Sequence, residues 1–349
     1  MSEFAEFHAE LRSVANDLLG KGTADWQLLA DAGWTGLEVR EQLGGAGASF
    51  GEVAIVVEEM GRAAARNDYF GGAVLAVGAL NALSADAARD SLLTDVATGS
   101  ARVAVVLSPF AIEQAPAGVR VTGRAEFVLD ADGADRLLVL ADAGDGPVIV
   151  DLGAGTDGLS VTSQPVLDES RQLSVVVADT IVDPSALRRF EGDPADQVRR
   201  LFDRASTAIA CDSLGVSEAM LSATVSYASV RHQFGRPIGS FQAVKHACAD
   251  MFVRISVARQ LVRAAVDAVA ADNADATTAT SMAKAYVCGA AVDIAGKAMQ
   301  LHGGIGYTWE SGIHVYLKRA LLNRSLFGSP AAHRKNLARR YFHDAVTDN

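Results

Sequence analysis

Two glycine-containing stretches in the second half of the sequence carry side chains that could hold a ligand. The first runs from Tyr227 to Gln242 and includes Arg231, Phe234 and Gly235. A guanidinium at a helix end, followed by an aromatic ring and a glycine that turns the chain, can present a bidentate donor and a flat apolar surface to a diphosphate-linked ligand. The same residue types also suit a tight turn between helices, with Phe234 in the core and Arg231 in solvent.

The second stretch, from Gln300 to Tyr307, contains Gly303 and Gly304 directly after a long helical pattern. Paired glycines lack Cβ atoms, so the backbone can approach a ligand closely and donate its amides to it. A glycine that ends a helix before an ordinary turn is the alternative interpretation.

The pattern of apolar residues predicts the elements that position both stretches. Residues 1–100 have helical spacing, residues 101–185 contain short valine-rich runs separated by Asp- and Gly-rich turns, and residues 186–349 return to long helical patterns. We therefore expect an α+β fold, with an N-terminal helical domain, a small antiparallel β domain and a C-terminal helical bundle. Ser240 is the predicted N-cap of one bundle helix.

Composition and charge exclude several classes of protein. The chain has 349 residues, 50% of them hydrophobic, and a net charge of −11, which argues against binding along a nucleic-acid backbone. Cys211, Cys248 and Cys288 lie far apart without metal-ligand spacing, so we expect neither a disulfide nor a metal site. The acidic N-terminus differs from a signal peptide, and apolar runs are too short for a membrane span; we expect a cytoplasmic protein.

Charge is unevenly distributed along the chain. Residues 1–100 contain 6 Lys or Arg against 15 Asp or Glu, whereas residues 311–340 contain 7 Lys or Arg and no acid. The basic segment could bind the phosphates of a nucleotide-like ligand, or it could be a solvated helix face or a contact with an acidic face in an oligomer. Its basic residues are Lys318, Arg319, Arg324, Arg334, Lys335, Arg339 and Arg340.

Taken together, the two stretches resemble one family, the flavin-dependent acyl-CoA dehydrogenases. In that family an Arg-x-x-Phe-Gly turn, a Gln eleven residues after the Arg, and a Gln-x-x-Gly-Gly turn occur in this order in the C-terminal helical domain. The similarity extends to segments 26–47 and 304–310. The matching residues here are Arg231, Phe234, Gly235, Gln242, Gln300, Gly303 and Gly304.

The resemblance implies a tetramer in which FAD lies in a groove shared by two subunits. It implies that the Arg-Phe-Gln and Gln-Gly-Gly elements contact the pyrophosphate and adenosine of the neighbouring subunit's FAD, while the neighbour's β domain holds the isoalloxazine ring. It also implies an acyl-CoA substrate, and an electron-transfer flavoprotein or a similar acceptor as a partner.

The β domain departs from the family pattern at two places. The family's Thr-Glu-Pro loop corresponds to residues 107–113, and its Trp-x-Thr or Trp-x-Ser strand to residues 123–129, where aliphatic side chains replace the hydroxyl and indole donors. The N5 and O4 edge of a flavin would lack hydrogen bonds from this subunit. We therefore expect the flavin site of this chain itself to be empty or weak.

The catalytic base is a further departure. Dehydrogenation between Cα and Cβ requires a carboxylate that removes the α-proton while hydride leaves for the flavin. In most members a Glu precedes a Gly-Thr dipeptide; here Phe327 precedes Gly328 and Ser329, and the alternative position used by some members corresponds to Ala205. We therefore expect no catalytic base in this chain.

Other polar residues near these positions are weaker candidates. Asp203 matches the Asp of a Phe-Asp pair that some members carry beside the acyl-CoA path, which makes it a candidate for substrate binding. Glu218 and Glu310 are interpreted as solvated residues, and His246 and His302 as residues that pack or form hydrogen bonds rather than transfer protons.

These features predict one member of a pair of unequal subunits in a flavin-dependent acyl-CoA dehydrogenase. Some members of the family form α2β2 heterotetramers, in which one chain supplies the base and the flavin-ring contacts and the other completes the groove. Such pairs are associated with bulky acyl-CoA esters, including steroid side chains in actinobacteria. Two alternatives remain: a complete homotetrameric dehydrogenase whose base lies elsewhere, and a non-catalytic scaffold subunit that does not touch flavin.

Overall fold

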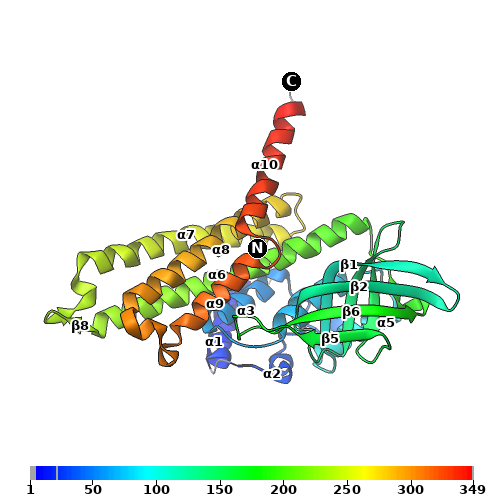
Figure 1. Ribbon diagram of the computed structural model, residues 1–349, viewed down its shortest axis with the longest axis horizontal. Coiled ribbons are helices and arrows are strands. Elements are labelled where there is room, and N and C mark those ends of the chain that lie inside the picture. The colour runs from blue at the N-terminus through cyan, green and yellow to red at the C-terminus, as the bar shows by residue number, and fades with distance from the viewer. Residues whose placement is uncertain (1–4, 21–22, 348–349) are drawn as a thin grey trace.

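Helices, a sheet and further helices follow one another along the chain, as predicted (Figure 1). The computed structural model describes residues 5–20 and 23–347. A capping box fixes the start of the helix that begins at Phe50. The Ser49 side chain accepts a hydrogen bond from the backbone N–H of Glu52, and the Glu52 side chain accepts one from the backbone N–H of Ser49. The N-terminal elements are η1 (Ala5–Phe7), α1 (His8–Leu19), α2 (Trp26–Asp31), η2 (Glu41–Leu43), α3 (Phe50–Ala63), the π-helix η3 (Phe70–Ala76), α4 (Val77–Asn81) and α5 (Ala87–Ala97).

The middle of the chain forms one seven-stranded sheet in the order β5-β6-β2-β1-β3-β4-β7. Its pairs are antiparallel except that β1 and β3 run parallel, with Val103 opposite Arg136, which corrects the prediction of a wholly antiparallel sheet. After β2 the chain crosses over β1 and forms β3 on the other edge of β1. β3 therefore runs in the same direction as β1. The strands are β1 (Val103–Ala115), β2 (Gly118–Leu129), β3 (Arg136–Asp142), β4 (Pro147–Gly153), β5 (Leu159–Ser163), β6 (Leu173–Val182) and β7 (Leu187–Arg188), with η4 (Pro184–Ala186) before β7.

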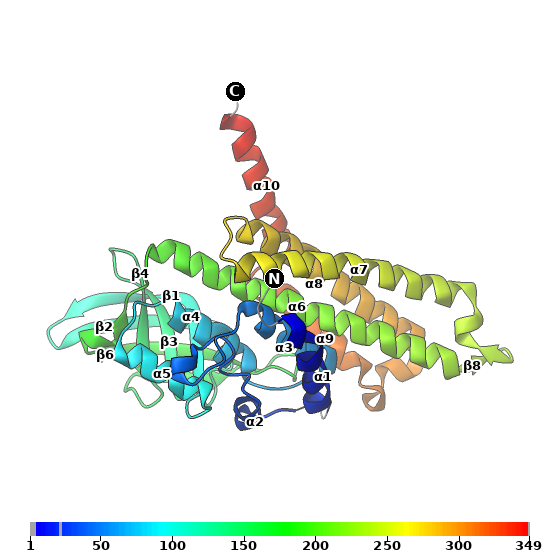
Figure 2. The ribbon, with the colours of Figure 1, turned by 180° about the vertical axis from the view of Figure 1, so that it is seen from behind.

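The C-terminal helices form a bundle along the long axis of the molecule, and a small hairpin lies at the end far from the sheet (Figures 1 and 2). The last helix projects away from the bundle in both views. The elements are α6 (Pro194–Val230), β8 (His232–Gln233), β9 (Arg236–Pro237), η5 (Ile238–Ser240), α7 (Gln242–Ala270), α8 (Ala276–His302), η6 (Gly303–Tyr307), η7 (Trp309–Ser311), α9 (Ile313–Ser325) and α10 (Pro330–Thr347).

Local sequence signals set the ends of two bundle helices. α6 begins at Pro194, and the preceding Asp193 accepts a hydrogen bond from its first turn. α7 begins at Gln242 without a side-chain cap. The predicted N-cap, Ser240, lies instead in η5, where its hydroxyl donates to Pro237 O at 2.7 Å. The prediction is wrong because a short 3₁₀ turn precedes α7.

The middle of α6 forms part of the core. Residues 203–217 of this 37-residue helix are all buried. Gly215 allows α3 to approach closely, since a Cβ at this position would lie 1.9 Å from Glu58 O. α6 is long and apolar enough to cross a membrane, but 67% of its most apolar window is buried inside the protein, as in a core helix.

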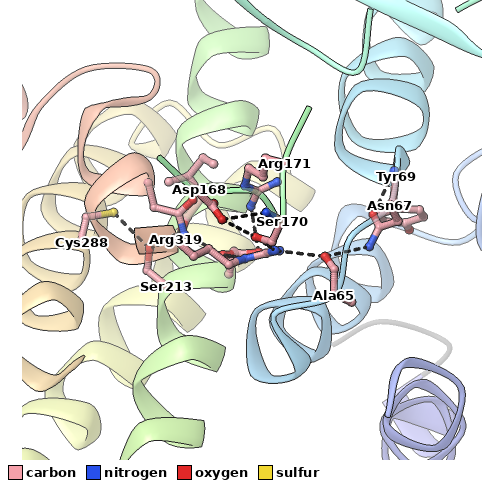
Figure 3. A network of polar contacts seen from close by, with 12 residues as sticks. Ala65, Asn67, Tyr69, Asp168, Ser170, Arg171, Ser213, Cys288 and Arg319 are labelled. Atoms are coloured by element: carbon pink, nitrogen blue, oxygen red, sulfur yellow. Dashed lines mark hydrogen bonds and ion pairs between the residues drawn. The ribbon is translucent and has the colours of Figure 1, made fainter. Parts of the chain in front are cut away.

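A buried ion pair joins the three parts of the fold. Figure 3 shows Arg319 of this pair with Ala65, Ser170 and Arg171 around it. Arg319 on α9 is 2% exposed and donates from Nη2 to Asp212 Oδ2 on α6 at 2.6 Å. Its Nη1 donates to Ala65 O, just after α3, at 3.0 Å and to Ser170 Oγ, between β5 and β6, at 2.9 Å. Arg171 adds a second cation 2.9 Å from Asp212. Burial by itself raises the pKa of Asp212, but the two guanidinium groups lower it to about 2.

We predict that Asp212→Asn lowers the free energy of unfolding by about 3–5 kcal/mol, because it leaves two guanidinium groups buried without their anion. Denaturant titration followed by circular dichroism measures the change. Asp179→Asn, which breaks the exposed ion pair with Arg120, is the matched control and should hardly move the unfolding midpoint. Equal midpoints for Asp212→Asn and the wild type would contradict this role for the ion pair.

A second buried carboxyl, Asp130, connects the sheet to the N-terminal helices. It directly follows β2 with φ 56°, and its Oδ2 accepts a hydrogen bond from Gly71 N of η3 at 2.6 Å. Burial and the neighbouring charge of Asp68 raise the pKa of Asp130 to about 7. The carboxyl therefore changes its charge near neutral pH at a contact between two parts of the fold.

The raised pKa of Asp130 predicts a pH-dependent stability. The folded state binds this proton more tightly than the unfolded state, so the contribution is fully present below the ordinary pKa of 3.8 and is lost as pH rises through about 7. We predict that the wild type loses free energy of unfolding relative to Asp130→Asn between about pH 4 and about pH 8. Denaturant titrations at both pH values test this, and a constant difference would show that Asp130 does not titrate in this range.

Candidate functional site

A pocket of about 400 Å³ lies where the C-terminal ends of α6 and α8 meet; we call it the distal pocket. Four of the six residues predicted to bind the cofactor line it, whereas Phe234 and Gln242 are exposed outside it. The lining residues are Tyr227, Arg231, Gln233, Ile238, Gln300, Leu301, His302, Gly303, Gly304 and Ile305.

The end of α6 and the β8–β9 hairpin position Arg231. Its N–H donates to Tyr227 O at 2.9 Å, and its carbonyl accepts from Ile238 N at 2.8 Å. Phe234 and Gly235 form the two-residue turn of the hairpin, with φ values of 53° and 77°. A turn of this kind requires positive φ at both positions, and this conformation strains Phe234 because it is not glycine. Phe234 is 91% exposed, so the interpretation that places it in the core is wrong.

Arg231 and Gln300 present hydrogen-bond donors to the distal pocket. Gln300 Oε1 accepts from Lys297 Nζ at 2.8 Å, so the NH2 of the same amide is the group left for a ligand. Arg231 offers a planar guanidinium that can donate two parallel hydrogen bonds. Gly303 ends α8 with φ 61°, a conformation that a residue with a Cβ adopts only with strain. These groups fit the oxygens of a diphosphate, and hence the central part of a dinucleotide.

A second pocket, of about 570 Å³, lies between the sheet, η3, the start of α6 and the end of α9; we call it the inter-domain pocket. Ten of its thirteen lining residues are apolar. Glu126, its charged member, is exposed and pairs with Arg124 at 2.9 Å. The lining residues are Leu75, Val105, Leu107, Ser108, Glu126, Phe127, Val128, Leu129, Phe202, Leu322, Ser325, Leu326 and Phe327.

The inter-domain pocket suits an apolar group better than the polar edge of a flavin ring. Ser108 and Ser325 are the side-chain hydroxyl donors of its lining. Phe127, on an irregular part of β2, has φ 58° and is 50% exposed, and its N–H donates to Gln164 Oε1 at 2.9 Å. A positive φ strains the backbone of Phe127, and backbone strain of this kind is more typical of functional positions than of regular strands.

Phe327 forms part of this pocket at one of the positions where the sequence lacks a base. It has φ 51°, and its carbonyl accepts from Ser206 Oγ at 3.3 Å and from His333 Nε2 at 3.0 Å. Its ring stacks on Phe70 with 5.9 Å between centroids. Ala205, the alternative position, is fully buried. Neither position carries a carboxylate.

The acids considered from the sequence do not line either pocket. Asp203 accepts from Thr277 Oγ1 at 2.6 Å and pairs with Arg199 at 3.0 Å, while the adjacent Phe202 lines the inter-domain pocket. Glu218 forms ion pairs that connect α6 to α3 and α7. Across residues 5–20 and 23–347 no group of three or more His, Cys, Asp or Glu side chains could hold a metal ion.

Three pocket residues were not predicted from the sequence to contact a ligand. Tyr227 lies four residues before Arg231, a spacing that places both on one side of a helix and could have identified it. His302 was expected to pack or form hydrogen bonds, and it stacks on Tyr227. The sequence gives no comparable signal for Glu126. The register of β2 shifts between Ala125 and Val128, which breaks the alternation of side chains between the two faces of the strand.

The basic segment 311–340 is not one continuous surface. Arg319 lies in the buried ion pair with Asp212, which corrects the expectation that it faces phosphates, solvent or another subunit. Lys318 Nζ lies 5.1 Å from the centre of the Trp309 ring, and Arg324 is exposed. The side chain of Arg340 lies outside those that the structure describes.

α6 separates the two pockets. Phe202 near its start lines the inter-domain pocket, and Tyr227 near its end lines the distal pocket. At 1.5 Å per residue, the roughly 25 residues between them extend about 40 Å. Both views place the hairpin and the sheet at opposite ends of the molecule (Figures 1 and 2). One dinucleotide is too short to occupy both pockets of the same chain.

Comparisons with known proteins agree with one another. The family model for the acyl-CoA dehydrogenase N-terminal domain matches residues 2–100, and that for the acyl-CoA dehydrogenase C-terminal domain matches residues 195–342. The acyl-CoA dehydrogenase IpdE2 of Mycobacterium tuberculosis is 35% identical over 327 residues, which cover 92% of this chain and 88% of that protein.

Two solved structures have a similar fold over nearly the whole chain. The ChsE4-ChsE5 complex from Mycobacterium tuberculosis aligns with a TM-score of 0.88 and 25% identity, over 97% of each chain. A variant of the Tcur3481-Tcur3483 steroid ACAD aligns with a TM-score of 0.87 and 27% identity, over 98% of this chain and 99% of that chain.

Proposed function

The chain belongs to the acyl-CoA dehydrogenase family, and from this premise we propose that it is the subunit of an α2β2 acyl-CoA dehydrogenase that completes the FAD site of a catalytic partner. In this assembly the distal pocket binds the diphosphate and adenosine of FAD. The β domain of the partner holds the flavin ring. The partner also supplies the base.

The separation of the two pockets carries this proposal. The distal pocket has donors for a diphosphate, and the inter-domain pocket lies about 40 Å away along α6. In the proposed assembly a dinucleotide in the distal pocket extends toward another subunit. The hairpin beside this pocket supports such a contact, because it exposes the strained Phe234 almost completely.

The chemistry of the inter-domain pocket supports a partner that carries the base. Removal of the α-proton of a thioester requires a group that accepts a proton at that carbon. FAD, when bound, accepts the hydride from the β-carbon. Phe327 and Ala205 offer no proton acceptor at the two positions that the family uses. In the proposed assembly this chain binds and orients the cofactor and leaves proton abstraction to its partner.

The proposed substrate is a bulky acyl-CoA thioester, including one with a steroid side chain. The similarity to a steroid ACAD and to the two-component ChsE4-ChsE5 complex supports both the substrate class and the unequal pair. An electron-transfer flavoprotein or a similar carrier is the proposed electron acceptor. It would reoxidise the flavin held by the pair.

One observation favours the complete homotetrameric enzyme as a second candidate. Glu126 lines the inter-domain pocket and could accept a proton there. Its exposure and its ion pair with Arg124 weigh against this role, because a base for a weakly acidic carbon is better served by a desolvated carboxylate. The heterotetramer is therefore the preferred assembly.

We predict that Arg231→Ala, in the assembled complex, weakens FAD binding by roughly 10- to 100-fold, because it removes a charge-assisted donor to the diphosphate. Titration of the flavin-stripped complex, followed by flavin fluorescence, measures the affinity. Arg236→Ala is the matched control: Arg236 lies on the same hairpin, over the Phe241 ring, and does not line the distal pocket. A scaffold subunit that does not touch flavin would give unchanged affinity for both variants.

A further inference from the structure

His302 and Tyr227 form a stacked pair inside the distal pocket. The ring of His302, the last residue of α8, lies 4.5 Å from the ring of Tyr227 on α6, with 22° between the ring planes. Both residues line the pocket, and His302 is 7% exposed. His302 is attached to α8 and its ring stacks on Tyr227 of α6, so the orientation of the imidazole ring is fixed.

A hydrogen bond determines which nitrogen of His302 remains for a ligand. Nδ1 lies 2.8 Å from Ala298 O. A carbonyl oxygen accepts and does not donate, so Nδ1 carries the proton of the neutral ring. In the neutral ring, Nε2 then has no proton and acts as a hydrogen-bond acceptor.

This acceptor differs from the donors around it. Arg231 and the free NH2 of Gln300 both donate, and ionised phosphate oxygens accept from them. Ionised phosphate oxygens have no proton to give to Nε2 of His302. The group that matches Nε2 is therefore an O–H or N–H of the ligand next to the diphosphate.

We propose that His302 accepts a hydrogen bond from the adenosine half of FAD, and that Tyr227 positions the imidazole for this contact. The inference rests on the proposed function, since it assigns the distal pocket to FAD. A ribose hydroxyl and the adenine amine share the required chemistry. Nothing in this contact takes part in proton or hydride transfer.

The test is a titration of the flavin-stripped complex of this chain and its partner, followed by flavin fluorescence. His302→Phe keeps an aromatic ring in the stack and removes the acceptor, so we expect FAD to bind roughly 3- to 10-fold more weakly. Tyr227→Leu removes the stack and should weaken FAD by a similar factor. Tyr227→Phe keeps the stack and should bind FAD like the wild type.

FMN separates a direct contact from general damage to the pocket, because it lacks the adenosine half. We expect FMN to bind the wild type and His302→Phe equally well, whereas a structural defect that spreads to the flavin-ring site would weaken FAD and FMN alike and overturn the proposal. FAD analogues with hypoxanthine in place of adenine, or with 2′-deoxyribose in the adenosine, identify the donor. The analogue without the donor should bind the wild type and His302→Phe with the same affinity.

The outcomes for His302 and for the proposed function are distinguishable. If the wild-type complex does not bind FAD, the proposed function fails. If the wild-type complex binds FAD and His302→Phe binds it equally tightly, the proposed function stands and the role of His302 is overturned.

Discussion

The buried ion pair between Arg319 and Asp212 holds the sheet and the two sets of helices in one arrangement. Asp212 lies in the buried middle of α6, while Arg319 also reaches the end of α3 and the β5–β6 connection. Arg171, which shares the same carboxylate, lies 5.2 Å from the centre of the Phe70 ring, and Phe70 stacks on Phe327. A chain of contacts through Phe70 and Phe327 therefore connects the charge cluster to the inter-domain pocket.

The length of α6 is the feature from which the proposed shared site follows. The helix passes through the ion pair and continues about 40 Å from one pocket to the other. The end near the sheet has an apolar pocket without a base at the family's positions, and the far end has donors for a diphosphate. In the proposed assembly each end is half of a site, and the second chain supplies the complementary halves.

Much of this organisation could be predicted from local sequence. Hydrophobic periodicity gave the order of helices and strands, because it reflects which face of each element is buried. This order depends on short segments whose geometry is set by neighbours in sequence. The resemblance to the family, rather than local sequence, predicted that Arg231 and Gln300 belong to one site, and the bundle brings both into the distal pocket.

Features that depend on tertiary contacts could not be predicted in the same way. Arg319 resembled a surface residue among other basic residues, and its burial follows from Asp212, more than one hundred residues away. The parallel pairing of β1 with β3 follows from the path of a crossover. Phe234 is exposed because the hairpin turn directs it outward, although its residue type suggests a core. His302 acquires a defined tautomer through Ala298 O and a stacking partner from another helix.

The flavin-to-chain ratio of the complex isolated from the native host tests the shared site most directly. Visible absorbance gives the flavin content, and a denaturing gel gives the chains that copurify with this one. The proposed heterotetramer predicts about one FAD per two chains, with a second dehydrogenase-like chain in equal amount. About one FAD per chain, in a homotetramer that gives a single band, would contradict it and would establish the complete enzyme instead.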